Sequence, residues 1–179
     1  VGNLVSIPEV RDFALQQQAM QAVLALLDSK DTCKYVLLTA DTKETSMLRV
    51  GIWTLSNLCR GSPPLTWDLV IAATKAAARL VSSTDMEVVA DALWSLNFLS
   101  EKKQAVVETD VCPQLVIFLL NKQAEIHVPA LQILGNVLGG DPDLKTPALV
   151  AIQPLLKHPN IRVRKEAAKV FAELGGILE

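Results

Sequence analysis

Apolar residues recur along this chain at the three- and four-residue spacing of an amphipathic helix. Breakers rich in Gly and Pro interrupt this pattern, most clearly at 61–64 and 139–142. Ala, Leu and Val supply most of the apolar content, which suits closely packed helices better than a sheet sandwich. We therefore expect an all-α chain with helices over 8–18, 19–29, 47–60, 69–81, 84–101, 102–108, 113–120, 124–138 and 161–174.

Local signals predict where several of these helices begin. Pro8 stands in the first turn of the helix that it opens, where proline is tolerated. Ser83 or Thr84 is expected to cap the 84–101 helix, with Glu87 in the first turn. Pro129 is expected to mark either a kink or a late start in the 124–138 helix.

The 47–60 segment, MLRVGIWTLSNLCR, has two contrasting faces. Residues three and four apart share a helical face. One face carries the apolar residues Leu48, Ile52, Leu55 and Cys59, which we expect to be buried. The other carries Trp53, Ser56, Asn57 and Arg60. A large aromatic ring beside an amide can sandwich an aliphatic side chain and hydrogen-bond a peptide backbone.

This face recurs along the chain. The 84–101 helix carries Glu87, Asp91, Trp94, Phe98 and Glu101 on one stripe. Trp94 lies 41 residues after Trp53, a spacing typical of two- and three-helix solenoid repeats. Asn136 follows Phe98 by 38 residues, and Asn3 lies in register upstream. Two tryptophans in register on polar stripes favour a ligand surface over a buried core.

The period predicts a single solenoid domain over 1–179. We expect a partial repeat at 1–7 and about four further repeats at 8–61, 62–101, 102–140 and 141–179. The chain opens in the middle of the pattern, so we interpret it as a fragment of a longer protein. Uncapped solenoid ends favour self-association.

Charge and composition exclude several classes of protein. The net charge of −2 leaves no basic excess to neutralise phosphates, so nucleic acid is not an expected partner. The longest apolar run, at 115–120, is too short to cross a bilayer, so no membrane contact is expected.

The sequence predicts neither a metal, nor a cofactor, nor an enzyme. Cys33, Cys59 and Cys112 are scattered without metal-ligand spacing and are expected to be free thiols in a reducing compartment. His127 and His158 lack acidic or cysteine neighbours, and we expect surface or capping roles for both. No nucleophile–base pairing, phosphate loop or carboxylate pair is visible.

Three segments, GIWTLSNLCRG, VVADALWSLNFLSE and PALQILGN, occur in an order and at intervals that resemble the central armadillo repeats of the importin-α family. The resemblance covers nearly the whole chain, from about the third armadillo repeat to the seventh. It implies a right-handed armadillo-repeat superhelical solenoid. It also implies an adaptor, found in cytoplasm and nucleus, that joins cargo carrying a basic nuclear localisation signal to importin-β.

The resemblance assigns roles to the recurring stripe. In this family, Trp rings clamp the methylenes of signal lysines, and Asn amides hold the extended peptide backbone. The implied peptide-binding residues are Trp53, Asn57, Trp94, Phe98, Asn136 and Asn3, together with Asp91 and Glu101 as acidic partners of signal lysines or arginines.

Several positions depart from the family pattern. Ile7 and its neighbours replace an acidic contact, and Gln132 stands where an Arg is expected. Lys169 and Glu173 replace the Trp and Asn of the next repeat, so we predict that the family's second, minor signal site is absent or weakened. The importin-β-binding segment is not part of these residues.

The departures keep two other hypotheses open. The chain could be a diverged armadillo scaffold that binds another extended peptide or protein partner. An enzyme would need a polar pocket that the sequence does not show.

Overall fold

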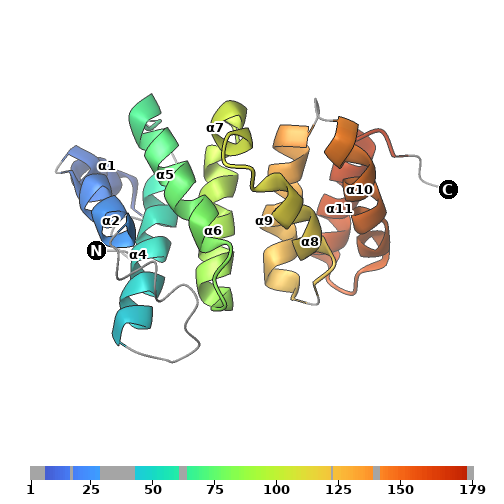
Figure 1. The fold of residues 1–179 in the computed structure, drawn as a ribbon, viewed down its shortest axis with the longest axis horizontal. Coiled ribbons are helices and arrows are strands. Elements are labelled where there is room, and N and C mark those ends of the chain that lie inside the picture. The colour runs from blue at the N-terminus through green and yellow to red at the C-terminus, as the bar shows by residue number, and fades with distance from the viewer. Residues whose placement is uncertain are drawn as a thin grey trace. The chain divides into compact units, whose positions relative to one another are not determined.

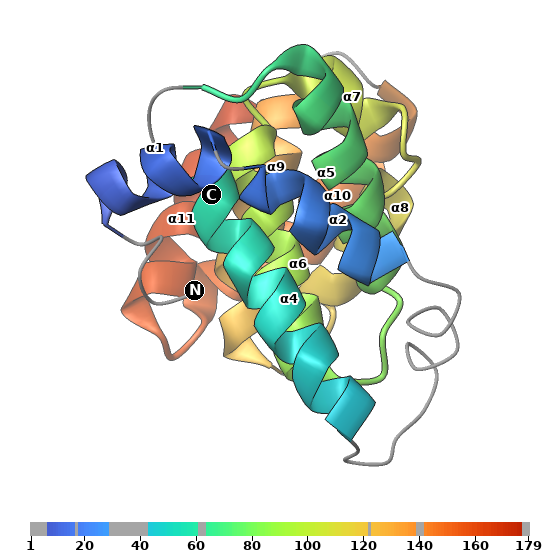
Figure 2. The ribbon, with the colours of Figure 1, turned by 90° about the vertical axis from the view of Figure 1, so that its left-hand side faces the viewer.

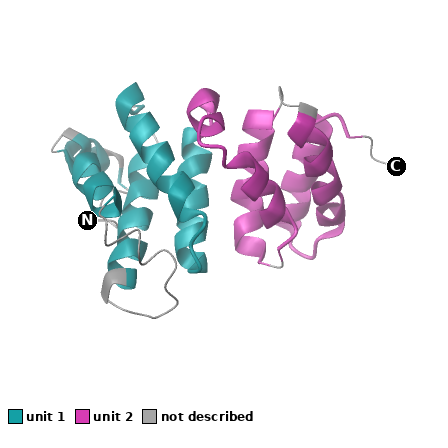
Figure 3. Cartoon of the chain, in the orientation of Figure 1, with its two compact units in different colours: residues 1–99 teal, residues 100–179 magenta. Residues whose placement is uncertain are grey.

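The described residues of this chain form only helices and their connections (Figure 1). A computed structural model describes residues 7–16, 18–28, 43–60, 64–121, 123–138 and 142–176. The chain divides into two compact units, residues 1–99 and 100–179 (Figure 3). The all-α prediction is confirmed for these ranges, whereas the boundaries of the individual repeats stay a prediction.

The first unit contains five described helices. They are α1 (Pro8–Gln16), α2 (Ala19–Asp28), α4 (Lys43–Cys59), α5 (Trp67–Leu80) and α6 (Met86–Leu99). Helix α4 packs along α6, and α5 packs against α6 as well. Figure 2 shows α4 crossing in front of α6, with α1 and α2 beside it.

The second unit contains α7 (Lys103–Val107), α8 (Cys112–Leu119), α9 (Ala124–Val137), α10 (Pro142–Ile152), the 3-10 helix η3 (Gln153–Lys157) and α11 (Ile161–Glu173). Helix α9 is central, since both α8 and α11 pack against it. It begins at Ala124, five residues before Pro129, so the predicted late start is wrong.

Small residues allow the helices of the first unit to approach closely. Ala73, Ala76 and Ala77 of α5 are buried. On α4, a Cβ atom at Gly51 would lie 3.0 Å from Leu27 Cδ2 and 3.3 Å from Leu26 Cδ2 of α2. Gly51 therefore lets α4 and α2 pack at a distance that a side chain would oppose.

A buried arginine joins α1 to the end of α4. The Nε atom of Arg11 donates to the carbonyl oxygen of Leu58 at 3.0 Å, and Nη1 pairs with Asp12 Oδ1 at 3.0 Å. A carbonyl in the last turn of a helix has no partner within that helix, and a cation is favoured there by the helix dipole. Arg11 thus supplies a hydrogen-bond donor to a carbonyl in the last turn of α4, the helix that carries Trp53.

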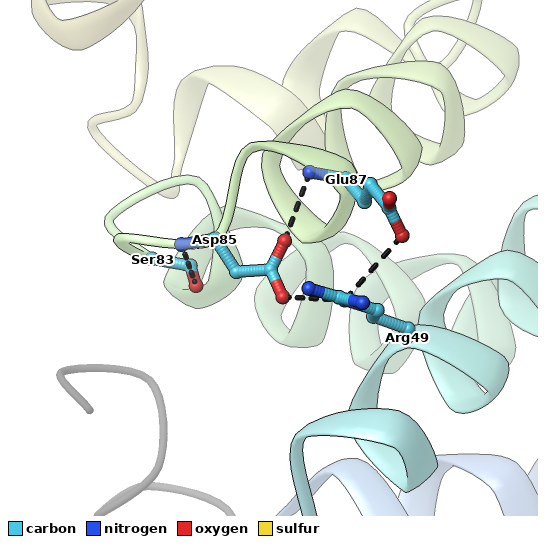
Figure 4. A network of polar contacts seen from close by, with 4 residues as sticks. All are labelled: Arg49, Ser83, Asp85 and Glu87. Atoms are coloured by element: carbon cyan, nitrogen blue, oxygen red, sulfur yellow. Dashed lines mark hydrogen bonds and ion pairs between the residues drawn. The ribbon is translucent and has the colours of Figure 1, made fainter. Parts of the chain in front are cut away.

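The first turn of α6 is capped by Asp85, so the prediction that Ser83 or Thr84 caps it was wrong. Asp85 Oδ1 accepts from the backbone N–H of Glu87 at 3.0 Å. Ser83 supports the cap instead, since its Oγ accepts from the Asp85 N–H at 3.1 Å (Figure 4). Asp is a favoured N-cap residue because its carboxylate satisfies an unpaired N–H of the first turn.

His127 is buried, so the predicted surface role was wrong for this residue. The residue is 1% exposed, and Nε2 lies 2.8 Å from the carbonyl oxygen of Asn121. Nδ1 has no hydrogen-bond partner among the described residues, and the ring meets His158 edge-on with centroids 5.3 Å apart. His158 accepts from the Asn160 N–H at 3.1 Å, next to the cap that Asn160 makes on α11.

Replacing Gly51 with leucine should destabilise the first unit, because the added side chain has to enter the contact between α4 and α2. Overpacking of this kind costs about 1–3 kcal/mol. Thermal and denaturant unfolding would measure the loss. Val50→Leu is the control, since Val50 is 58% exposed on the same helix and should tolerate the change. Equal stability of the two variants would contradict the close approach.

Acidification should destabilise the second unit through His127. Burial lowers the pKa of His127 below its ordinary value of 6.5. As pH falls below about 6.5, the unfolded chain therefore takes up a proton that the folded chain resists, and stability is lost. Melting temperatures measured between pH 7.5 and 5.5 should fall less for His127→Gln, which keeps a donor for Asn121 without titrating. Parallel curves for the parent and the variant would refute this coupling.

Candidate functional site

The polar face of α4 is organised as its residue spacing predicts. Leu48, Ile52, Leu55 and Cys59 are buried, which confirms the predicted apolar stripe. On the other face, Trp53 and Asn57 are half-buried and Arg60 is exposed. Ser56 is buried, and its Oγ donates to the Trp53 carbonyl oxygen at 2.9 Å. This face is therefore only partly covered by the chain itself.

The matching face of α6 carries a half-buried acid and two aromatic rings. Leu93 and Leu96 are fully buried on the opposite side. Trp94 and Phe98 lie one turn apart with ring centroids 6.1 Å from each other and planes inclined by 29°, a stacked arrangement. Asp91 precedes them by one turn.

A groove runs between these faces of α4 and α6, both within the first unit. It has a volume of about 420 Å³ and is lined by Trp53, Ser56, Asn57, Arg60, Asp91, Trp94 and Phe98. Five of the eight predicted binding residues thus line one groove. Ser56 and Arg60 were not among those eight, although the three- and four-residue spacing from Trp53 already placed both on this face.

Hydrogen bonds within α4 orient the polar groups of the groove. Asn57 Nδ2 donates to the carbonyl oxygen of Trp53 at 3.1 Å. The same carbonyl accepts from Ser56, so both side chains are tied to the turn that carries the indole. An amide held in this way presents fixed donor and acceptor directions, which suits hydrogen bonding to a peptide backbone.

Asp91 is the acidic group of the groove. Burial, and secondly the charge of Glu87 one turn away, raise the pKa of Asp91 to about 6. No ion pair joins Asp91 to another residue of the described ranges. A half-buried carboxylate beside two indoles would gain from a cation that restores its lost solvation.

Of the other three predicted residues, the two that the structure describes do not line this groove. Glu101 is exposed and belongs to the second unit. Asn136, on α9, is exposed, and its Nδ2 donates to Ser100 Oγ at 2.7 Å. Asn3 lies outside the described residues.

In the second unit, Glu166 contacts two of the positions that depart from the family pattern. Glu166 on α11 accepts from Gln132 Nε2 on α9 at 3.1 Å and pairs with Lys169 Nζ at 3.5 Å. Lys169 also lies 4.0 Å from Glu173. These side chains pair with one another, and the contact contains no indole.

Other kinds of chemistry have little support in the described parts of the chain. Cys59 and Cys112 are buried and form no disulfide within the described ranges, while Cys33 lies outside the described residues. Burial raises the pKa of Cys59 to about 12, which keeps the thiol protonated. Within the same ranges, no three His, Cys, Asp or Glu side chains are grouped to hold a metal ion. None of the described helices is long and apolar enough to span a membrane.

Comparison with solved structures identifies the architecture. A designed armadillo repeat protein in complex with the peptide (KR)4 matches with a TM-score of 0.73 over 97% of this chain and 72% of that chain, at 19% sequence identity. A second designed armadillo repeat protein matches with a TM-score of 0.66 over 97% of this chain and 90% of its own. The fold is therefore the predicted all-α armadillo solenoid.

Comparison of sequences places the chain in a family, although no protein-family model matches it. Importin subunit alpha-1a of Oryza sativa subsp. japonica is 39% identical over 178 residues, which cover 93% of this chain and 31% of that protein. Importin subunit alpha-3 of Arabidopsis thaliana is 37% identical over 149 residues, or 81% of this chain and 26% of that protein. The chain thus spans less than a third of the length of these relatives. Over the segment that it spans, it belongs to the importin-α family.

Proposed function

We propose that this chain is the cargo-binding part of a nuclear-import adaptor and binds Lys/Arg-rich nuclear localisation signals in extended form along its Trp/Asn face. The observation that carries the proposal is Asp91, a half-buried carboxylate without an ion pair among the described residues, in a groove lined by two tryptophans. Such a groove offers a long cationic side chain both apolar and charged contacts.

The aromatic rings supply the first part of the recognition. Trp53 and Trp94 come from different helices and both line the groove, so methylenes of a lysine or arginine can pack on the indoles. An ammonium or guanidinium near an indole face gains about 0.5–2 kcal/mol. The stacked pair of Trp94 and Phe98 holds the second indole in place.

Asp91 and Asn57 supply the second part. The carboxylate of Asp91 would pair with one cation of the peptide, which favours basic sequences and makes binding depend on salt. The amide of Asn57, oriented by the Trp53 carbonyl, would hydrogen-bond the peptide backbone. Together they favour a basic peptide over a neutral one.

The dimensions of packed helices agree with an extended ligand. Neighbouring helices lie about 8–10 Å apart. An extended peptide advances about 3.3 Å per residue, so each repeat can address about three residues. The designed armadillo protein bound to (KR)4 supports the compatibility of this fold with a peptide made of lysine and arginine.

The wider role follows from the family. We propose cargo signals as the partner of these residues, with cytoplasm and nucleus as the location. The proposal assigns importin-β no contact on these 179 residues, and needs neither cofactor, nucleic acid nor membrane. We further propose that Glu101, Asn136 and Asn3 extend the peptide surface, and that the ends of the chain favour self-association.

One observation favours a second candidate, a diverged armadillo scaffold for another extended partner. Glu166 contacts both Gln132 and Lys169, so charged side chains fill the face where the family has its second signal site. Such a chain would bind through the first unit alone, or bind a ligand of different charge.

Removing both indoles should weaken binding of a basic peptide. A labelled Lys/Arg-rich signal peptide titrated against Trp53→Ala/Trp94→Ala should bind at least about fivefold more weakly than to the parent, because two cation–π contacts of about 0.5–2 kcal/mol each are lost. Trp67→Ala is the matched control, since Trp67 is an exposed tryptophan on α5 that does not line the groove. A folded parent chain that does not bind the peptide would favour the diverged scaffold.

Binding should weaken in acid through Asp91. The free carboxyl has a pKa of about 6, and pairing with a cation lowers it, so the ionised form is the one that binds. Between pH 7.5 and 5 the dissociation constant should rise about tenfold, because about nine in ten Asp91 side chains are then protonated. Asp91→Asn should bind more weakly at pH 7.5 and show a flatter pH profile. An equally steep profile for this variant would mean that another group governs the effect.

A further inference from the structure

An arginine of this chain forms ion pairs with the acidic residues next to the groove. Arg49 extends from α4 to the first turn of α6, where its Nε lies 2.6 Å from Asp85 Oδ2 and 3.4 Å from Glu87 Oε2 (Figure 4). This guanidinium binds carboxylates as the cation of a peptide would. The contact lies entirely within the first unit.

The bond to Asp85 fixes the position of Arg49. The Asp85 side chain is only 12% exposed. Its other oxygen caps α6 by accepting from the Glu87 N–H, and its own N–H donates to Ser83. A carboxylate held from several sides cannot turn away, and a short charge-assisted bond to it is strong. Arg49 is therefore anchored beside the groove.

Glu87 is held more loosely and lies closer to the groove residues. Its side chain is 73% exposed, and its contact with Arg49 is the longer of the two. Glu87 stands one helical turn before Asp91 on the same face of α6, as Arg49 stands one turn before Trp53 on α4. The charge of Glu87 reaches Asp91, whose pKa it raises.

We propose that Arg49 is an internal counter-ion that neutralises Glu87 and thereby limits the cation-binding part of the groove to Asp91. This inference rests on the proposed function, because it concerns which cations the same groove accepts. A second basic side chain near Glu87 meets an anchored guanidinium instead of a free carboxylate. A like charge placed against one ligand contributes to specificity by disfavouring that ligand.

A double-mutant cycle between Arg49 and Glu87 tests the proposal, with a Lys/Arg-rich peptide as the probe. Arg49→Gln should tighten binding about two- to fivefold, the range that an exposed ion pair contributes. Glu87→Gln in the parent should change binding less than about twofold, because its charge is already neutralised. In the Arg49→Gln background, Glu87→Gln should remove the whole gain. Such non-additivity is the signature of direct coupling.

Two further variants separate this coupling from a general effect of charge. Arg60→Gln removes a cation that lines the groove on the same helix, and it should combine additively with Glu87→Gln. Arg49→Lys keeps the positive charge and should bind as the parent does. Melting temperatures show whether each variant is folded, since Arg49 also contacts the cap of α6.

The outcomes are distinct. Additive effects of Arg49→Gln and Glu87→Gln overturn the counter-ion role and leave the proposed peptide binding intact. A gain in Arg60→Gln that depends on Glu87 in the same way also overturns it. Absence of peptide binding in every folded variant overturns this inference together with the proposed function.

Discussion

The packing of α4 along α6 is the contact on which the groove depends. Each helix buries one apolar face, including Ile52 and Leu55 on α4 and Leu93 and Leu96 on α6. Full burial of such a side chain contributes about 1.5–3 kcal/mol, so these faces cannot rotate outward. The opposite faces are thereby fixed toward the groove, with Trp53 and Trp94 half-buried beside it.

Electrostatics gives this groove its character. The described part of the chain supplies no counter-ion to Asp91, although it supplies Arg49 to Asp85 and Glu87 one turn away. The same side chain type thus behaves differently along one helix. Asp85 caps α6 and forms an ion pair with Arg49. Asp91 has no such partner among the described residues, and partial burial raises its pKa to about 6. A structural role explains the first carboxylate, whereas the second is the one that we propose to pair with a ligand.

The second unit follows the same helical plan with a different surface. Gln132, Glu166 and Lys169 satisfy one another across α9 and α11, while His127 is buried with one ring nitrogen unpaired among the described residues. The armadillo scaffold tolerates both faces because its core positions are apolar in each unit. Fold and surface chemistry therefore vary separately, and the family alone does not determine which repeats bind a ligand.

The sequence by itself determined most of the helices, the buried stripe of α4 and the set of side chains on its polar face, because a 3.6-residue period follows from local backbone geometry. It also placed Arg60 and Ser56 on that face. It did not predict α10, where the pattern indicated a shortened or lost helix, or the start of α4 at Lys43. The choice of Asp85 rather than Ser83 as the cap of α6 is local, between residues two apart, but a hydrophobic period does not distinguish neighbouring polar residues. Tertiary packing decided that Arg49 reaches Glu87 and that His127 is buried. The contact of Arg49 with Asp85, for example, joins residues 36 apart in the sequence. Periodicity within one helix carries no information about such a distance.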